Sequence, residues 1–196
     1  MRVAVFIDGG YFRSFLRSIG EPRIDFLKLS EKVSRPDDRF RTYYYNCMPF
    51  MSPNPSPADR RLYSDMDRFI NSLRNLPRFE VRLGRLRKYL NDRGQPTFEQ
   101  KGVDVYLSVD MVRLAATNQI GRAILIGGDS DFVPAIKTAK ENINVSLYYY
   151  RGTVHNELLQ ACDERFEMDN GFCSDILMNR ESSPTRTSKR DSHSIT

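Results

Sequence analysis

The chain has 196 residues, a formal net charge of +5 and a sequence pI of about 9.2. Hydrophobic residues make up 40% and charged residues 28%, which is ordinary for a soluble globular protein with one α/β domain. No apolar stretch reaches the ~18 residues that a membrane-spanning helix needs, and the basic charge is compatible with a polyanionic partner without requiring one.

The three cysteines, Cys47, Cys162 and Cys173, are odd in number and form no Cys-x-x-Cys pair. This spacing argues against a zinc site and against a disulfide framework, and it favours free thiols in a reducing compartment. The apolar run after Arg2 is too short for a signal peptide. We therefore expect a cytoplasmic protein without membrane association.

In the first half of the chain, apolar periodicity alternates between strand and helix patterns. Asp25 is a good N-cap for the second helix, and four prolines interrupt the segment before the third. In chain order, we expect a strand at 2–7, helices at 11–19 and 25–33, a strand at 41–46, a loop at 47–57 and a helix at 58–75.

In the second half, the strand pattern at 79–86 loses its alternation at Gly84, which predicts a β-bulge there. A turn at 91–94 makes residues 85–101 a predicted hairpin that projects beyond the sheet. The remaining expected elements are a helix at 103–117, a strand at 123–126, a helix at 132–142, a strand at 145–150, a helix at 155–162 and a strand at 165–168. This alternation predicts a three-layer α/β/α fold, with a mostly parallel sheet and helices on both faces.

Four aspartates stand where a predicted strand ends or a helix begins. They are Asp8, Asp104, Asp129 and Asp131. If the three segments meet at one sheet edge, the like charges repel unless a cation lies among them, and carboxylate oxygens favour Mg²⁺ or Mn²⁺. In a basic chain, this pattern predicts metal-dependent hydrolysis of a phosphodiester bond.

Simpler roles compete with this interpretation. Asp8 is equally suited to cap the helix that follows it, while Gly9 and Gly10 would let a phosphate or metal approach the backbone. The dipole of the following helix would stabilise Asp129 and Asp131 without a metal. Asp110 lies too far around its helix from Asp104 to share a site, so we expect it to be solvated or to act through its neighbours, and the role of Asp163 stays open.

Other chemistries find less support. The only histidines are His155 and His193, and no Gly-x-Gly-x-x-Gly or P-loop motif is present. A phosphatase with an aspartate nucleophile would need a second acidic residue two positions after Asp8, where this chain has Gly10. The phosphatase is therefore a minor alternative.

Three motifs resemble the NYN-domain family of the PIN-like nuclease superfamily, in particular its LabA-like (DUF88) branch. The matching stretches are Phe-Ile-Asp-Gly-Gly-Tyr at 6–11, Lys-Gly-Val-Asp-Val at 101–105 and Gly-Asp-Ser-Asp-Phe at 128–132, with a further similarity at 157–163. The resemblance covers residues 1–169. It leaves residues 170–178 as a C-terminal extension and 179–196 as a Ser/Thr-rich, disordered tail.

The resemblance implies a Rossmann-like three-layer α/β/α fold with a mostly parallel sheet. It also implies a magnesium-dependent endoribonuclease whose catalytic and metal-binding residues are the four aspartates named above. Many members place asparagine shortly after the first aspartate, where this chain has Gly10 and Tyr11. This difference leaves open an alternative, a weak or inactive NYN-fold regulator that binds RNA or protein.

The predicted hairpin is the basic part of the chain. Between residues 78 and 101, three acidic residues accompany Arg78, Arg82, Arg85, Arg87, Lys88, Arg93 and Lys101. Lys101, Arg85 and Arg87 are the predicted substrate-binding side chains, and Tyr89 and Phe98 would stack on unpaired bases. We expect the partner to be single-stranded RNA, although for any single arginine a solvated charged hairpin is a better explanation than RNA contact. The sequence does not decide whether the chain forms a homo-oligomer.

Overall fold

The computed structural model describes residues 1–90 and 94–178, and a single seven-stranded sheet forms its centre. The strands are β1 (Arg2–Asp8), β2 (Asp38–Cys47), β3 (Phe79–Leu90), β4 (Pro96–Lys101), β5 (Arg122–Ile126), β6 (Asn144–Tyr149) and β7 (Glu164–Glu167). Their order across the sheet is β4-β3-β2-β1-β5-β6-β7, and only the β3–β4 pair is antiparallel.

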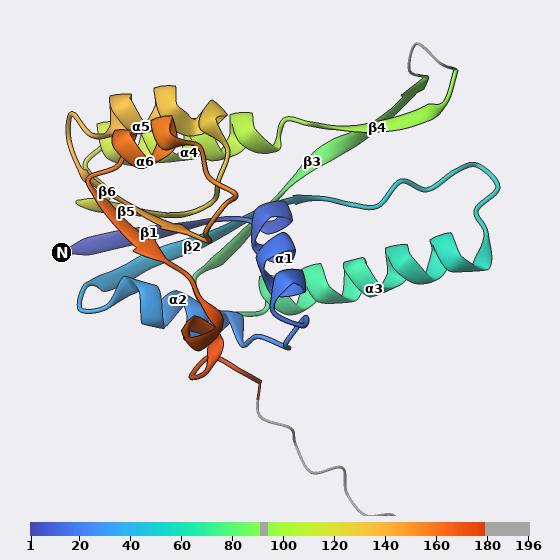
Figure 1. Cartoon of the computed structure of the whole chain (residues 1–196), viewed down its shortest axis with the longest axis horizontal. Helices are drawn as coiled ribbons and strands as arrows, with labels where there is room; N and C mark the ends of the chain where they lie inside the picture. Colours follow the sequence, from blue (N-terminus) through green and yellow to red (C-terminus); the bar gives the residue numbers. More distant parts are fainter. Residues whose placement is uncertain (91–93, 179–196) are drawn as a thin grey trace, which may run out of the picture.

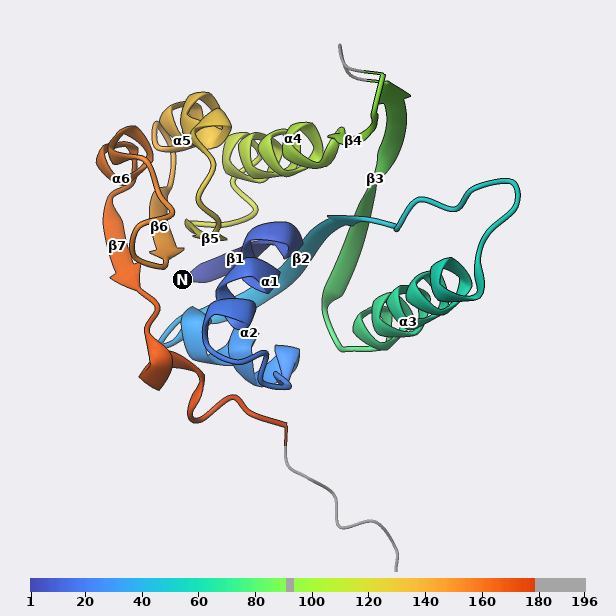
Figure 2. The same ribbon diagram turned by 45° about the vertical axis from the view of Figure 1, so that its right-hand side comes forward.

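Helices cover both faces of the sheet, as Figures 1 and 2 show. They are α1 (Gly9–Ser18), α2 (Phe26–Ser34), α3 (Pro57–Arg74), α4 (Val103–Ala116), α5 (Val133–Ala139) and α6 (Asn156–Ala161). Two short 3₁₀ turns, Ser130–Phe132 and Asn170–Cys173, complete the described elements. The predicted three-layer architecture is thereby confirmed.

The sheet reverses its winding direction between β1 and β5. From β1 the chain adds β2 and β3 on one side, and it then crosses through α4 to add β5, β6 and β7 on the other. Without β4, this is the strand order of doubly wound α/β sheets. In such sheets the crevice at the carboxyl ends of the two strands that flank the reversal is the usual ligand site.

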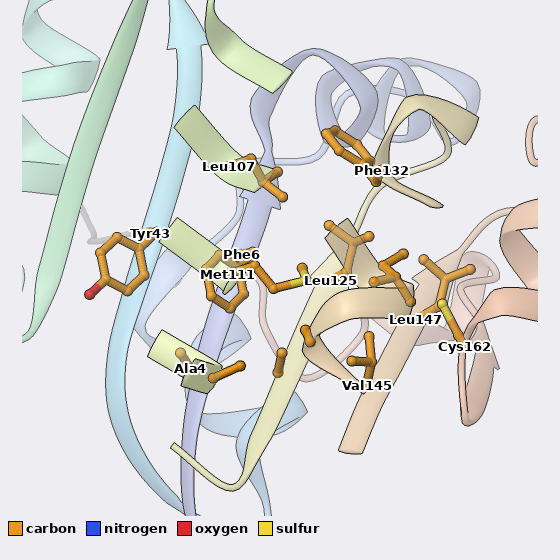
Figure 3. Close-up of a cluster of buried hydrophobic side chains, with 14 of the residues drawn as sticks. Ala4, Phe6, Tyr43, Leu107, Met111, Leu125, Phe132, Val145, Leu147 and Cys162 are labelled. Carbon is orange, nitrogen blue, oxygen red and sulfur yellow. The ribbon is translucent and has the colours of Figure 1, made fainter. Parts of the chain in front are cut away.

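Two hydrophobic clusters hold the layers together, one on each face. In β1, Ala4 and Phe6 face the α4–α5 side, whereas Val3, Val5 and Ile7 face the side of α1 and α2. Figure 3 shows the first cluster, in which Leu107 and Met111 of α4 lie beside Phe6. A central parallel strand is buried on both faces, which explains why β1 is an unbroken apolar run.

The hairpin is confirmed, but the predicted bulge at Gly84 is wrong. β3 pairs with β2 in regular register up to Gly84 and with β4 from Arg85 onward. A Cβ at Gly84 would lie 2.6 Å from Cγ2 of Val103 and 2.7 Å from the carbonyl oxygen of Lys101. The glycine is therefore needed for close packing against the end of β4 and the start of α4, and the loss of alternation marks the change of strand partner.

Several boundaries differ from those expected. β2 begins at Asp38 because its polar first residues already pair with Arg2 and Val3 of β1. α5 is shorter than the expected helix at 132–142, since a 3₁₀ turn precedes it and the chain leaves the helix after Ala139. The predicted turn at 91–94 lies mostly outside the described residues, and the predicted tail at 179–196 lies wholly outside them.

The segment 170–178 packs against the α1–α2 face of the sheet. Cys173 and Ile176 are buried there, and Leu177 forms an isolated bridge with Ile24. The three cysteines are free, as expected from their spacing, and all three are buried. No helix within residues 1–90 and 94–178 is long and apolar enough to cross a membrane.

Candidate functional site at the carboxyl edge of the sheet

Asp8 ends β1 at the point where the sheet reverses direction. It is the N-cap of α1, and its Oδ1 accepts a hydrogen bond from the backbone N–H of Tyr11 at 3.0 Å. Burial, together with the charges of Asp104 and Asp129, raises the pKa of Asp8 from 3.8 to about 6, against the lowering effect of the Tyr11 and Gly10 amides. The capping role is therefore real, but it leaves a carboxylate whose charge is poorly compensated.

Asp129 follows β5 on the other side of the reversal. Its Oδ1 accepts a hydrogen bond from the backbone N–H of Asp131 at 2.9 Å, which caps the 3₁₀ turn Ser130–Phe132. Both side chains are exposed. The negative charge of Asp129 reaches Asp8 and Asp104 and raises the pKa of each.

Asp104 enters the same edge from the first turn of α4. Gly102 precedes the helix with φ +88°, a left-handed conformation that glycine adopts easily and that turns the chain from β4 into α4. Burial raises the pKa of Asp104, and the charges of Asp129 and Asp131 raise it further. Three segments that are distant in sequence thus place their carboxylates within electrostatic reach of one another.

The donor set suits a hard divalent cation that keeps part of its water shell. Within residues 1–90 and 94–178, none of the four aspartates forms an ion pair with a basic side chain. Within the same residues, no three Asp, Glu, His or Cys side chains are grouped closely enough to hold one ion. Mg²⁺ is commonly held by one or two carboxylates, with water and substrate phosphates supplying the other oxygens, so this arrangement fits such an ion and not a closed protein cage.

An open cavity of about 360 Å³ lies between the ends of β1 and β5. Asp8, Gly10 and Asp129 line it, together with Tyr11, Gly128, Thr153 and His155. The last two residues were not identified from the sequence because the loop after β6 carries no recognisable motif. His155, one of the two histidines of the chain, lines the same cavity as Asp8 and Asp129.

Tyr11 is a wall of this cavity and is fixed in place by hydrogen bonds. Its hydroxyl lies 2.9 Å from Oγ1 of Thr153 and accepts a hydrogen bond from the backbone N–H of Tyr150 at 3.0 Å. A Cβ at Gly128 would lie 2.1 Å from Cε2 of Tyr11. Gly128, the second glycine after β5, therefore makes room for the ring of Tyr11. Tyr11 stands near the position where many NYN-domain proteins carry asparagine.

The two glycines after Asp8 have different surroundings. Gly9 is buried, and a Cβ there would lie 2.4 Å from the hydroxyl oxygen of Tyr44. Gly10 is exposed and lines the cavity, with only Oδ1 of Asp8, at 3.4 Å, near its hypothetical Cβ. The predicted substrate contact of both glycines stays a prediction, and Gly10 has the accessible surface for it.

The hairpin projects from the carboxyl end of β3, at the same edge of the sheet (Figure 1). Arg85 pairs across the strands with Lys101, which is three residues before Asp104, and Arg87 follows on the same face by strand alternation. All three side chains are exposed, as is Tyr89. Phe98 belongs to the other face of the hairpin, where its ring packs against Phe50 at 5.2 Å between centroids, with the two ring planes tilted by 49°.

Two arginines from the predicted basic set have structural partners. Arg78 pairs with Asp38, and Arg82 pairs with Asp110. Asp110 is buried and not solvated, since it also accepts a hydrogen bond from the hydroxyl of Tyr45 at 3.0 Å and forms an ion pair with Arg113.

Asp163 has a structural role as well. Its Oδ2 accepts a hydrogen bond from the backbone N–H of Val145 at 2.8 Å, and its other oxygen lies 2.9 Å from Nζ of Lys140. These contacts join the segment that follows α6 to β6 and to Lys140, the residue directly after α5. Neither Asp110 nor Asp163 lines the cavity.

The comparisons with known proteins identify the family and support the fold. The family model for the NYN domain matches residues 2–169. The crystal structure of a protein of unknown function from Vibrio parahaemolyticus RIMD 2210633 is similar, with a TM-score of 0.57 and 19% identity over 90% of this chain and 96% of that one, which supports the fold. No curated protein matches the sequence. From the family match over most of its length, the chain belongs to the NYN-domain family and thus to the PIN-like nuclease superfamily.

Proposed function

We propose that this protein is a metal-dependent endoribonuclease that hydrolyses single-stranded RNA. One observation carries the proposal: Asp8, Asp104 and Asp129 come from three separate segments, and burial together with the neighbouring carboxylates raises the pKa of Asp8 and of Asp104 at the reversal point of the sheet. Such repulsion destabilises the fold unless a cation compensates it, so the arrangement is better explained by function than by folding. NYN-domain proteins are typically nucleases, which supports the same conclusion.

The candidate ligands for Mg²⁺ or Mn²⁺ are Asp8, Asp104, Asp129 and Asp131, of which one or two would bind the ion directly. When bound, the ion makes a water molecule easier to deprotonate and neutralises the charge that grows on the phosphate and the leaving oxygen. The backbone amides of Gly10 and Tyr11 orient the Asp8 carboxylate. The aspartates are ligands and not nucleophiles, so no covalent enzyme intermediate forms.

The hairpin would hold the RNA backbone on its way to this edge. Exposed Arg85, Arg87 and Lys101 offer phosphate contacts, and the exposed ring of Tyr89 offers a stacking surface for an unpaired base. Because Lys101 is only three residues before Asp104, an RNA strand bound along the hairpin would place one of its phosphates near the carboxylates. The hairpin is thereby the substrate track of the proposed enzyme.

The test is cleavage of a fluorescent, unstructured RNA oligonucleotide with Mg²⁺, with Mn²⁺ and with a chelator. We expect cleavage only with metal, and we expect Asp129→Asn to abolish it while RNA binding persists. The matched control is Asp38→Asn, because Asp38 is exposed at the opposite ends of the strands, where β2 begins. Cleavage by Asp129→Asn at the parent rate, or equal cleavage in chelator, contradicts the proposal.

A second candidate function is RNA binding without efficient cleavage. Tyr11 packs against Gly128 near the position where many family members carry asparagine, and the described residues contain no group of three metal-binding side chains. In the same assay, this candidate predicts stable RNA binding and no metal-dependent product. Assignment to the LabA-like branch remains part of either proposal.

A further inference from the structure

A second hollow, of about 260 Å³, lies among α1, α2, β2 and α3. Its walls are mostly aromatic and aliphatic side chains: Phe12, Leu16, Phe26, Leu62, Met66 and Phe69. Pockets for drug-sized ligands have volumes of ~300–1,000 Å³, so this one suits a single planar ring system. Aromatic and thioether walls of this kind favour a flat, polarisable group.

Two buried polar side chains from β2 also line this hollow. Nδ2 of Asn46 donates a hydrogen bond to the hydroxyl oxygen of Tyr44 at 3.0 Å, and Oδ1 of Asn46 accepts one from the backbone N–H of Cys47 at 2.8 Å. The hydroxyl hydrogen of Tyr44 has no acceptor among the residues that the structure describes. Burial raises the pKa of Tyr44 to about 12, so the hydroxyl keeps this hydrogen and can donate it to a ligand.

The hollow borders the carboxylate edge directly. Gly9, next to Asp8, lies against Tyr44 and Asn46, because a Cβ there would meet the hydroxyl oxygen at 2.4 Å and Nδ2 of Asn46 at 2.7 Å. The Tyr44 hydroxyl also experiences the charges of both Asp8 and Arg13. Arg13 lines the hollow and is exposed, so it can meet a phosphate that joins a group inside the hollow to the edge.

We propose that this hollow binds one unpaired nucleobase of the RNA substrate, next to the phosphate that is cleaved. The base would lie between Met66 and the ring of Phe12 or Phe26, and the Tyr44 hydroxyl would donate to one of its acceptors. Arg13 would contact the adjoining phosphate. The inference rests on the proposed function for its choice of RNA, and it gives that site a means of selecting single-stranded substrate, since a paired base cannot enter.

The test uses two tryptophan substitutions on α3. Met66→Trp fills the hollow, whereas Ser64→Trp places the same side chain at an exposed position that does not line it. Binding of adenosine and uridine 5′-monophosphates and of a fluorescent single-stranded RNA is measured by calorimetry and anisotropy, in chelator, after thermal unfolding has shown that each variant folds. Tyr44→Phe serves as a second variant that removes the hydroxyl and keeps the ring.

We expect Met66→Trp to weaken mononucleotide and RNA binding by roughly 5- to 150-fold, the effect of losing one base–aromatic stack. Ser64→Trp should bind as the parent does, and Tyr44→Phe should weaken binding by roughly 2- to 12-fold through loss of one hydrogen bond. Unchanged binding in Met66→Trp and Tyr44→Phe overturns the nucleobase assignment, as does a parent that binds RNA but no mononucleotide. In that case the hollow would suit an apolar peptide and not a nucleobase.

Failure of the two proposals can be told apart. If the parent cleaves RNA with metal and Met66→Trp binds and cleaves as the parent does, the nuclease stands and the base pocket does not. If the parent never cleaves but Met66→Trp loses nucleotide binding, the base pocket stands and the nuclease does not.

Discussion

Asp8→Asn is expected to stabilise the metal-free protein at neutral pH. Burial is the main cause that raises the pKa of Asp8 from 3.8 to about 6, and the charges of Asp104 and Asp129 add to it. A rise of this size corresponds to about 3 kcal/mol of unfavourable interaction for the ionised form. Asparagine caps helices as well as aspartate does, so the substitution removes the charge and keeps the hydrogen bond to the Tyr11 amide.

The pH dependence follows from the direction of the shift. Because the folded state holds the Asp8 proton more tightly than the unfolded state, the contribution of this group to stability is present below pH 3.8 and is lost as pH rises to about 6. Above that pH the loss is complete. Asp8→Asn lacks this loss, so its advantage over the parent should be absent at pH 3.5 and reach about 3 kcal/mol at pH 7.5.

The assay is urea unfolding at both pH values in chelator, for the parent, Asp8→Asn and the control Asp25→Asn. Asp25 caps α2 through the amides of Leu27 and Lys28, so the control tests the same substitution at a cap away from the carboxylates. Addition of Mg²⁺ should stabilise the parent and leave Asp8→Asn nearly unchanged, since a ligand stabilises the state that binds it. If Asp8→Asn is no more stable than the parent at pH 7.5 in chelator, the reasoning that burial and the neighbouring charges destabilise the ionised Asp8 carboxylate is refuted.

Three further predictions concern the surrounding structure. Gly128→Ala should lower the free energy of unfolding by ~1–3 kcal/mol, because its Cβ would lie 2.1 Å from Cε2 of Tyr11, and an unchanged urea midpoint would contradict this. Asp110→Ala should cost ~1–3 kcal/mol in the same assay by leaving the buried hydroxyl of Tyr45 without its acceptor. Arg87→Glu should weaken RNA binding equally for all RNA sequences, and it should reduce the slope of log Kd against log salt concentration by at least ~0.7. A loss of binding that depends on the RNA sequence would refute a pure phosphate contact.

The sequence predicts well where one physical cause dominates. β1 and β5 are unbroken apolar runs because both faces of a central parallel strand are buried. Asp8 ends β1 and is followed by two glycines, whereas two glycines and Asp129 follow β5, and this pattern identified both segments before the structure showed that they border the reversal point. Asp104 was identified from its place in the first turn of a helix, α4.

The sequence predicts less well where packing between distant segments decides. Position 84 needs a glycine because a Cβ there would lie too close to Val103 and Lys101. The local alternation of apolar and polar residues does not reveal either contact. Asp110 resembles any charged helix residue until Tyr45 and Arg82 are seen around it. His155 and Thr153 reach the cavity through a loop without a motif, so only the three-dimensional arrangement identifies them.

The most direct test of the central claim is a calorimetric titration of Mn²⁺ into the full-length protein and into Asp8→Asn and Asp104→Asn. We expect the parent to bind Mn²⁺ saturably at pH 7.5 and both variants to bind it much more weakly. The parent should also bind Mn²⁺ more weakly near pH 5, where Asp8 is protonated. No uptake by the parent, or uptake that neither substitution changes, would contradict the claim that these carboxylates form a divalent-cation site.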